Sequence, residues 1–317
     1  MPILLNIGIY LLLFFILWLG SGLIVSSVDA YTKRFRLSQF MVSFFILGIM
    51  TSIPEFSVGL ASVFENKPEI FVGNLFGGVV IIFLLIIPLL AIIGNGIRIN
   101  HDYSQDKILI TLGVIIAPSV LVLDKKVSNF EGLVLIFLYV LLFFILQKKN
   151  GIMGMFTKHT KIIKKFTGVV LIKILFGIII VSISSHFILQ KTIYFSQLIG
   201  IAPFYMSLIV LSLGTNLPEL MLAIRSVIQG KKDIAFGDYM GSATSNTLLF
   251  GVFTLFNRGG SFQVDNFLKT FVFILVGLSL FFIFSRTKKD ISRTEGFILL
   301  SLYILFIIIE LNGKIII

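Results

Sequence analysis

The chain has no cysteine among its 317 residues, and histidine occurs only three times. Without cysteine, neither a disulfide framework nor a thiolate metal site can form. His101, His159 and His186 are scattered along the sequence and predict no histidine metal cluster. A phosphate-binding loop and a nucleophile elbow are also absent from the sequence. These absences argue against ATP hydrolysis and against an enzyme.

Charged residues are scarce at 13%, whereas 57% of the residues are hydrophobic and the mean hydropathy is +1.06. A water-soluble domain would expose much of this apolar surface, so the lipid bilayer must solvate most of the chain. Apolar runs of roughly 20 residues, long enough to cross about 30 Å of hydrocarbon, recur along the sequence. The first run is too long for a cleaved signal peptide and lacks a basic segment before it. We expect an all-α, multi-pass integral membrane protein in a prokaryotic cell membrane.

Polar breaks divide the apolar runs into about ten predicted transmembrane helices, centred near residues 14, 50, 82, 115, 138, 179, 214, 245, 276 and 303. The segment 151–167 is predicted to be a basic cytoplasmic linker between two halves, 1–150 and 168–317. A contact of this linker with anionic lipid is the alternative to a plain solvated connection. Lysine and arginine concentrate in alternate loops, and the positive-inside rule then places both termini outside the cytoplasm. The net charge of +11 is therefore attributed to topology, and neither nucleic acid nor an obligate protein partner is predicted.

Two stretches of the chain are related by an ungapped shift of 164 residues. The shift superimposes Thr51 on Thr215, Pro54 on Pro218, Glu55 on Glu219, Gly73 on Gly237, Asn74 on Asp238 and Gly77 on Gly241. Each half has five predicted spans, an odd number, so the second half enters the membrane in the opposite sense. Transporters built from such inverted repeats form their ion sites near the midplane, where broken helices of both halves meet.

Pro54 and Pro218 each predict a break in a span, because proline has no amide hydrogen and collides with the carbonyl four residues earlier. The carbonyl that each proline frees needs a partner inside the bilayer, and a bound cation is one such partner. Glu55 and Glu219 follow directly, although a charge at the bilayer centre costs roughly 3 kcal/mol or more. Two opposed carboxylates with carbonyl oxygens form an all-oxygen cage that suits a hard cation such as calcium. The alternative is that the prolines merely kink two helices and each glutamate pairs with a local donor.

Further polar residues lie close to the two Pro-Glu pairs in the sequence. Ser52 and Asn216 directly follow the two threonines, and we expect their oxygens to point toward the same cavity. Ser242 and Asn246 are four residues apart, so they share one face of the eighth predicted span.

Five other polar residues in these spans have simpler interpretations. Thr244 and Ser245 are expected to hydrogen-bond to the backbone of their own helix. Asp238 and Asn74 are expected near the ends of spans eight and three, where they would be partly solvated. Arg225 is expected to reach the cytoplasmic surface or to pair with an acid.

The two stretches resemble the alpha repeats of the cation/calcium exchanger superfamily, and most closely those of sodium/calcium exchangers. The alpha-1 motif covers 48–82 and the alpha-2 motif covers 212–246. The resemblance implies ten transmembrane helices, alternating access and countertransport of calcium against sodium, with no cofactor. It also implies that Glu55 and Glu219, with the carbonyls of Thr51 and Thr215, hold calcium. The flanking sodium ligands implied by the resemblance are Ser52, Ser212, Asn216, Ser242 and Asn246.

The alpha-1 motif departs from the family pattern in three places. Met50 replaces a glycine, Gly78 replaces a serine, and Ile82 replaces a polar residue whose counterpart in the second repeat is Asn246. A dehydrated sodium ion needs oxygen ligands, and isoleucine has none to give. At least one flanking monovalent site is therefore expected to be weakened.

We predict a secondary antiporter that exchanges calcium for sodium. The first alternative is a calcium or other cation/proton antiporter, since two buried carboxylates in one site can also bind protons. A passive cation channel is a further alternative, although a channel more often builds its ring of acids from identical subunits. The predicted partners are accordingly calcium, sodium or protons as transported ions, together with membrane lipid.

Overall fold

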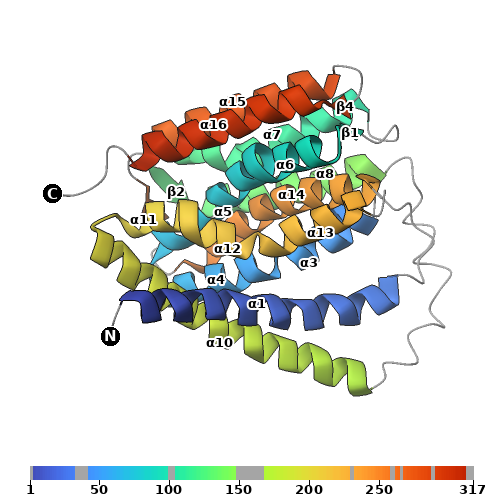
Figure 1. The fold of residues 1–317 in the computed structure, drawn as a ribbon. Coiled ribbons are helices and arrows are strands. Elements are labelled where there is room, and N and C mark those ends of the chain that lie inside the picture. The colour runs from blue at the N-terminus through green and yellow to red at the C-terminus, as the bar shows by residue number, and fades with distance from the viewer. Residues whose placement is uncertain are drawn as a thin grey trace.

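The computed structural model describes residues 3–32, 42–98, 104–147, 168–228, 232–257, 261–264, 267–286 and 290–311. Helices make up nearly all of this part of the chain, and two short two-stranded sheets complete it (Figure 1). The predicted linker 151–167 lies outside the described residues, as do many of the loop lysines and arginines on which the topology was based. The side chain of Arg225 also lies outside the described set.

The first half begins with the long helix α1 (Ile3–Thr32). A broken helix and a bent helix follow, and then two straight helices. The broken helix consists of η1 (Val42–Leu47), α3 (Gly48–Thr51) and α4 (Ile53–Phe64), and the bent helix of α5 (Pro68–Ile81), η2 (Ile82–Ile86) and α6 (Ile87–Ile93). The remaining elements are β1 (Ile97–Arg98), α7 (Gln105–Leu121), η3 (Val122–Asp124), β2 (Lys126–Ser128) and α8 (Asn129–Gln147).

The second half repeats this order, beginning with the long helix α10 (Gly168–Ile199). Its broken helix consists of α11 (Pro203–Met206), η4 (Ser207–Leu211), α12 (Ser212–Thr215) and α13 (Leu217–Ile228). The remaining elements are α14 (Lys232–Phe256), β3 (Ser261–Gln263), α15 (Leu268–Arg286), β4 (Asp290–Ile291) and α16 (Arg293–Leu311). The η elements of both broken helices are π-helical, and they are equivalent in the two halves.

The all-helical membrane fold with two repeats agrees with the prediction from the sequence, although length and composition alone identify fewer than ten spans. Seven helices among the described residues are long and apolar enough to cross a membrane, or eight if the bent pair around Ser52 is one span. The two other predicted spans are the broken helix around Asn216, whose apolar part Pro203–Thr215 is short, and α14. α14 is long enough, but it carries many polar residues. The two helices that fail the test of length and hydropathy are thus the ones that carry the polar alpha-2 motif.

The repeat extends beyond the two alpha motifs. β1 pairs antiparallel with β4, and β2 pairs antiparallel with β3, so each sheet joins the two halves. Ser128 and Glu131 exchange hydrogen bonds at the start of α8, and Ser292 and Glu295 do the same at the start of α16. These capping boxes satisfy backbone N–H groups that a helix start leaves free. They are 164 residues apart, as the alpha motifs are.

The centre of the bundle is formed by α5 and α14, and α1 and α10 lie side by side at its edge (Figure 1). Every residue of α5 from Ile70 to Ile81 is buried, which explains why this helix is apolar on all sides. α15 and α16 cover the opposite edge (Figure 1). The two broken helices therefore have protein rather than lipid around their breaks.

Candidate functional site

Both broken helices turn at one residue, Ser52 in the first repeat and Asn216 in the second. Their backbone angles nearly coincide, with φ −78° and ψ 9° at Ser52 and φ −86° and ψ 9° at Asn216. The two segments of the first broken helix are bent by 49° at this point. Proline is the second residue of the new helix in each case, where its missing N–H costs no hydrogen bond. The predicted breaks are thus present at both Pro-Glu sequences.

The breaks place a carboxylate at the start of each new helix. Glu55 lies in the first turn of α4 and Glu219 in the first turn of α13. The N-terminal end of a helix carries a partial positive charge and favours an anion. The preceding segments end at Thr51 and Thr215, so their C-terminal carbonyls lie at the same breaks. Helix starts with carboxylates and helix ends with carbonyls therefore meet in one region.

Two glycines let these breaks approach the central helices. A Cβ atom at Gly241 of α14 would collide with the carbonyl oxygen of Phe44, and one at Gly77 of α5 would collide with that of Leu208. Gly77 and Gly241 are 164 residues apart, and so are Phe44 and Leu208. In both repeats, the absence of a side chain at this glycine therefore lets the backbones of two helices cross in close contact.

All nine predicted ion ligands are buried; the most exposed is Thr51, at 5%. Glu55 and Glu219 have no exposed surface, and they lie close enough for their charges to interact. The Ser242 hydroxyl donates to Oε1 of Glu219 at 2.8 Å and lies 3.2 Å from the Ser52 hydroxyl. Ser242 thus contacts the carboxylate directly, and Ser52 of the other repeat is linked to it through Ser242.

The two threonines donate equivalent hydrogen bonds to Asp238 and Asn74, two residues expected from the sequence to be partly solvated. Thr51 donates through Oγ1 to Oδ1 of Asp238 at 3.2 Å, and Thr215 donates to Oδ1 of Asn74 at 3.1 Å. Asp238 and Asn74 are buried, so the expectation that they are partly solvated at span ends is wrong. Asp238 also lies close enough to Glu219 for their charges to interact. Asn74 and Asp238 each lie between two glycines of a repeated Gly-Asn/Asp-x-x-Gly pattern, and this repeated pattern could have indicated that they are buried.

Two asparagine side chains lie at the asymmetric part of the site. Asn216 donates through Nδ2 to the carbonyl of Ser212 at 2.9 Å, and Asn246 donates to the carbonyl of Leu75 at 3.3 Å. A Cβ at Gly78 would lie 2.8 Å from Nδ2 of Asn246 and 3.2 Å from Nδ2 of Asn216. The two amides therefore occupy the space that Gly78 leaves. Ile82, in contrast, is buried at the start of the π-helical segment η2 and offers no oxygen.

The remaining hydroxyl groups bond within their own helices. Ser212 donates to the carbonyl of Leu208 at 2.6 Å, so only its oxygen lone pairs remain for another partner. Thr244 donates to the carbonyl of Met240 at 2.7 Å, and Ser245 donates to that of Gly241 at 2.8 Å. The expectation that Thr244 and Ser245 hydrogen-bond to the backbone of their own helix is thus confirmed.

Several buried oxygen atoms in this region have no hydrogen-bond partner among the described residues. They are both carboxylate oxygens of Glu55, Oε2 of Glu219, Oδ2 of Asp238, and Oδ1 of Asn216 and Asn246. Buried polar atoms are normally satisfied, because an unpaired one costs free energy. Oxygen ligands alone suit hard cations such as calcium and sodium. No group of three or more acidic or histidine side chains that could hold a metal occurs in the described part of the chain.

Comparison with known proteins gives the same repeat structure. The profile of the sodium/calcium exchanger protein family matches residues 5–147 and 169–312. The sodium/calcium exchanger MaX1 of Methanosarcina acetivorans is 24% identical over 92% of this chain and 94% of its own. The inner membrane protein YrbG of Escherichia coli is 25% identical over 71% of this chain and 72% of its own.

A solved structure of the sodium-calcium exchanger NCX_Mj, soaked with sodium and strontium, has the same fold. Its TM-score is 0.68 at 22% identity, and the match covers 96% of this chain and 98% of the other. The protein is a multi-pass membrane transporter of cations rather than an enzyme. Since the family profile covers both halves and most of its length, the chain belongs to the sodium/calcium exchanger protein family.

Proposed function

We propose that this protein is a secondary antiporter that exchanges calcium for sodium, with calcium held between Glu55 and Glu219. The observation that supports the proposal is the set of buried, partnerless oxygens on Glu55, Glu219, Asp238, Asn216 and Asn246. They come from both repeats and lie around two helix breaks. A cation is the partner that would satisfy several oxygens of this kind at once.

In this proposal the negative charge of the site determines how many calcium or sodium ions bind at one time. Glu55 and Glu219 together balance one calcium ion or two sodium ions, and Asp238 lies close enough to add to the negative charge, so the two cargoes compete for the same oxygens. The carbonyls of Thr51 and Thr215 complete the calcium cage beside Glu55 and Glu219. The flanking sodium ligands are drawn from Ser52, Ser212, Asn216, Ser242 and Asn246.

Transport requires that the site open to each side of the membrane in turn. We assign this movement to α1 and α10, which pack against each other at the edge of the bundle (Figure 1). The direction of net flux then depends on the two ion gradients. By the distribution of basic residues we place both termini outside the cytoplasm, and residues 151–167 link halves 1–150 and 168–317 on the cytoplasmic side.

One observation supports protons as the alternative coupling ion. Ile82 occupies the position equivalent to Asn246 and removes an oxygen from the first repeat. A proton needs only one of the carboxylate oxygens, whereas a dehydrated sodium ion needs several ligands. Sodium is favoured because the Asn216 amide lies beside Gly78 and places an additional oxygen next to the depleted segment.

Isosteric amide substitutions test the proposed calcium site. Glu55→Gln and Glu219→Gln keep the side-chain shape but remove one charge each, so calcium flux in vesicles should be lost with either. Glu69→Gln, the same change at a partly exposed residue of α5, is the matched control and should retain wild-type flux. Wild-type flux in either site variant would contradict the assignment of the two carboxylates. Flux that fails to saturate and needs no counter-ion would indicate a channel instead.

A further inference from the structure

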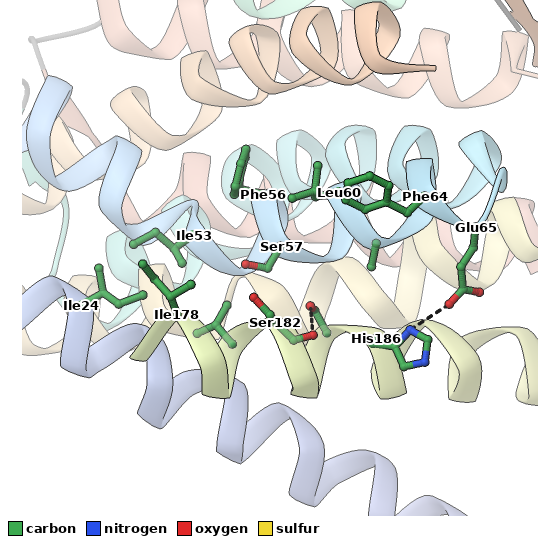
Figure 2. Close-up of a pocket in the computed structure, with 13 residues that line it drawn as sticks. Ile24, Ile53, Phe56, Ser57, Leu60, Phe64, Glu65, Ile178, Ser182 and His186 are labelled. Carbon is green, nitrogen blue, oxygen red and sulfur yellow. Dashed lines mark hydrogen bonds and ion pairs between the residues drawn. The ribbon is translucent and has the colours of Figure 1, made fainter. Parts of the chain in front are cut away.

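A groove that the ion site does not use lies between α4 and α10 (Figure 2). Its volume is about 670 Å³, which is within the range of roughly 300–1,000 Å³ typical of small-molecule sites. Most of its lining is apolar and comes from these two helices, with Ile24 of α1 at one end. The apolar lining includes Ile53, Phe56, Leu60 and Ile178.

The groove and the ion site lie on opposite faces of α4. The residues of α4 that line the groove are 53, 56, 57, 60, 61 and 64, which recur at the three- and four-residue spacing of one helical face. At 3.6 residues per turn, Glu55 points about half a turn away from the middle of this face. A ligand in the groove would therefore contact the helix that carries Glu55 without entering the ion site.

The two ends of the groove differ in polarity. At one end Nδ1 of His186 lies 3.0 Å from Oε1 of Glu65, and Nε2 of His186 lies 2.9 Å from Nε2 of Gln190 (Figure 2). Both members of this pair are partly exposed, His186 at 49% and Glu65 at 28%. At the other end the lining is apolar, with Ile24 and Ile53. The groove thus has one polar and one apolar end, as a site for an amphiphilic ligand requires.

The length of α4 matches the depth of one lipid leaflet. Glu55 and Glu65 are ten residues apart, so the helix rises by about 15 Å between them. Half of the hydrocarbon core of a bilayer is also about 15 Å. Inverted-repeat transporters form their ion sites near the midplane of the bilayer. With the helix break at that depth, Glu65 and His186 lie at the boundary with the head groups. The groove then runs along the acyl-chain region of a single leaflet.

Exposed apolar side chains border the groove. Phe64 and Ile178 line it and are exposed by 65% and 47%, and both belong to helices of a membrane-embedded bundle. The serine hydroxyls in the lining do not require a polar ligand: Oγ of Ser185, for example, donates to the carbonyl of Ser182 at 3.0 Å. A hydrocarbon chain entering sideways from the bilayer fits these features.

We propose that the groove between α4 and α10 binds one acyl chain of a membrane phospholipid, whose head group lies beside His186 and Glu65. The bound acyl chain lies between α10 and α4, the helix that carries Glu55. It thereby fills a space whose width must change whenever α10 moves relative to α4. The placement at one leaflet rests on the proposed function, in which an inverted-repeat transporter holds its ion site near the midplane, but lipid binding itself does not depend on ion exchange.

The first test uses the wild-type protein in vesicles that contain a phospholipid with a photoreactive diazirine near the end of one acyl chain. After irradiation, the modified peptides are identified by mass spectrometry. The expected result is modification of 53–64 and 178–186 that a tenfold excess of unlabelled phospholipid reduces. Labelling spread evenly over all lipid-facing helices would overturn the proposal. Labelling of these segments by a diazirine fatty acid, but not by the phospholipid, would also overturn it.

The second test fills the groove. Ser182→Phe places a ring in the groove, and Ser301→Phe makes the same change at an exposed position of α16 as a matched control. Native mass spectrometry then counts the phospholipids that each purified protein retains. The expected result is the loss of one bound phospholipid in Ser182→Phe alone. Equal numbers in both variants and the wild type would contradict the proposal, whereas calcium flux bears only on the proposed function.

Discussion

The hydroxyl oxygens of Ser52 and Ser242 lie 3.2 Å apart and join the broken helix of the first repeat to α14 of the second. Their counterparts 164 residues away are Asn216 and Gly78, and there the amide fills the space above the glycine. Two serine hydroxyls thus meet on one side of the site, whereas on the other side the larger Asn216 lies against a glycine that has no side chain. On the side of Gly78 the side-chain oxygen therefore comes from the second repeat alone.

Removing the Ser242 hydroxyl should weaken calcium binding. In Ser242→Ala, Glu219 loses the donor at 2.8 Å and the site loses an oxygen. Hydrogen bonds to charged groups contribute about 1.5–3 kcal/mol, so we expect half-maximal uptake at a calcium concentration about tenfold higher or more. The calcium dependence of uptake measures this change. Ser245→Ala, on the same helix, is the control, because its hydroxyl donates to the carbonyl of Gly241 rather than to Glu219. Equal calcium dependence in both variants would speak against a role for Ser242.

Asp238→Asn should alter the dependence on sodium. The amide oxygen of asparagine can still accept the hydrogen bond from Thr51, as Asn74 does from Thr215, so the geometry should survive. The lost charge lies close to Glu219, and nearby charges in a protein interact by on the order of 1 kcal/mol or more. We expect the sodium concentration for half-maximal exchange to rise several-fold. The measurement is a sodium titration of calcium flux, and an unchanged titration would show that Asp238 does not contribute to cation binding.

Gly78→Ala should reduce transport because its Cβ would lie within 2.8 Å of the Asn246 amide. Asn216→Ser, which copies the equivalent residue Ser52, removes the second close amide, 3.2 Å from that Cβ, so the Asn246 amide gains room to move aside and flux should be partly restored in the double variant. Gly113→Ala serves as the control, since a Cβ there meets nothing within 4 Å. Flux assays on the three variants decide the matter. Full activity in Gly78→Ala would mean that the amides move freely and do not need the space of this glycine.

Gly241→Ala should destabilise the folded protein. The new methyl group would collide with the backbone at Phe44, and backbone cannot move as easily as a flexible side chain. Overpacking of this kind typically costs about 1–3 kcal/mol, so we expect a melting temperature several degrees lower. Thermal unfolding in detergent, monitored beside Gly113→Ala, measures the difference. Equal melting temperatures would show that the two helices can separate at this crossing.

The sequence predicts those features that local chemistry determines. Proline next to glutamate predicts both helix breaks, because a missing N–H acts wherever the residue lies, and the turns occur at Ser52 and Asn216. The repeat of 164 residues also predicts that the two halves share an architecture. Hydropathy is less informative for α14, since its polar residues lower the apolar signal of a span that is enclosed by protein.

Features that depend on contacts between distant residues could not be predicted. Nothing near Asp238 in the sequence indicates that Thr51 is its partner, because the contact joins residues 187 positions apart. The short strands β1 to β4 have two or three residues each, too few for a periodic pattern. From the sequence, Gly78 is interpreted only as a missing serine. In the structure, Asn216 and Asn246 of the other repeat occupy the space beside it.

The most direct test of the account is radioactive calcium uptake into vesicles that contain the purified protein, with a sodium gradient or a proton gradient imposed separately. The account predicts uptake driven by an outward sodium gradient, and its loss in Glu55→Gln and Glu219→Gln. Uptake driven only by protons would contradict sodium as the coupling ion. Absence of uptake under both gradients would contradict calcium exchange itself.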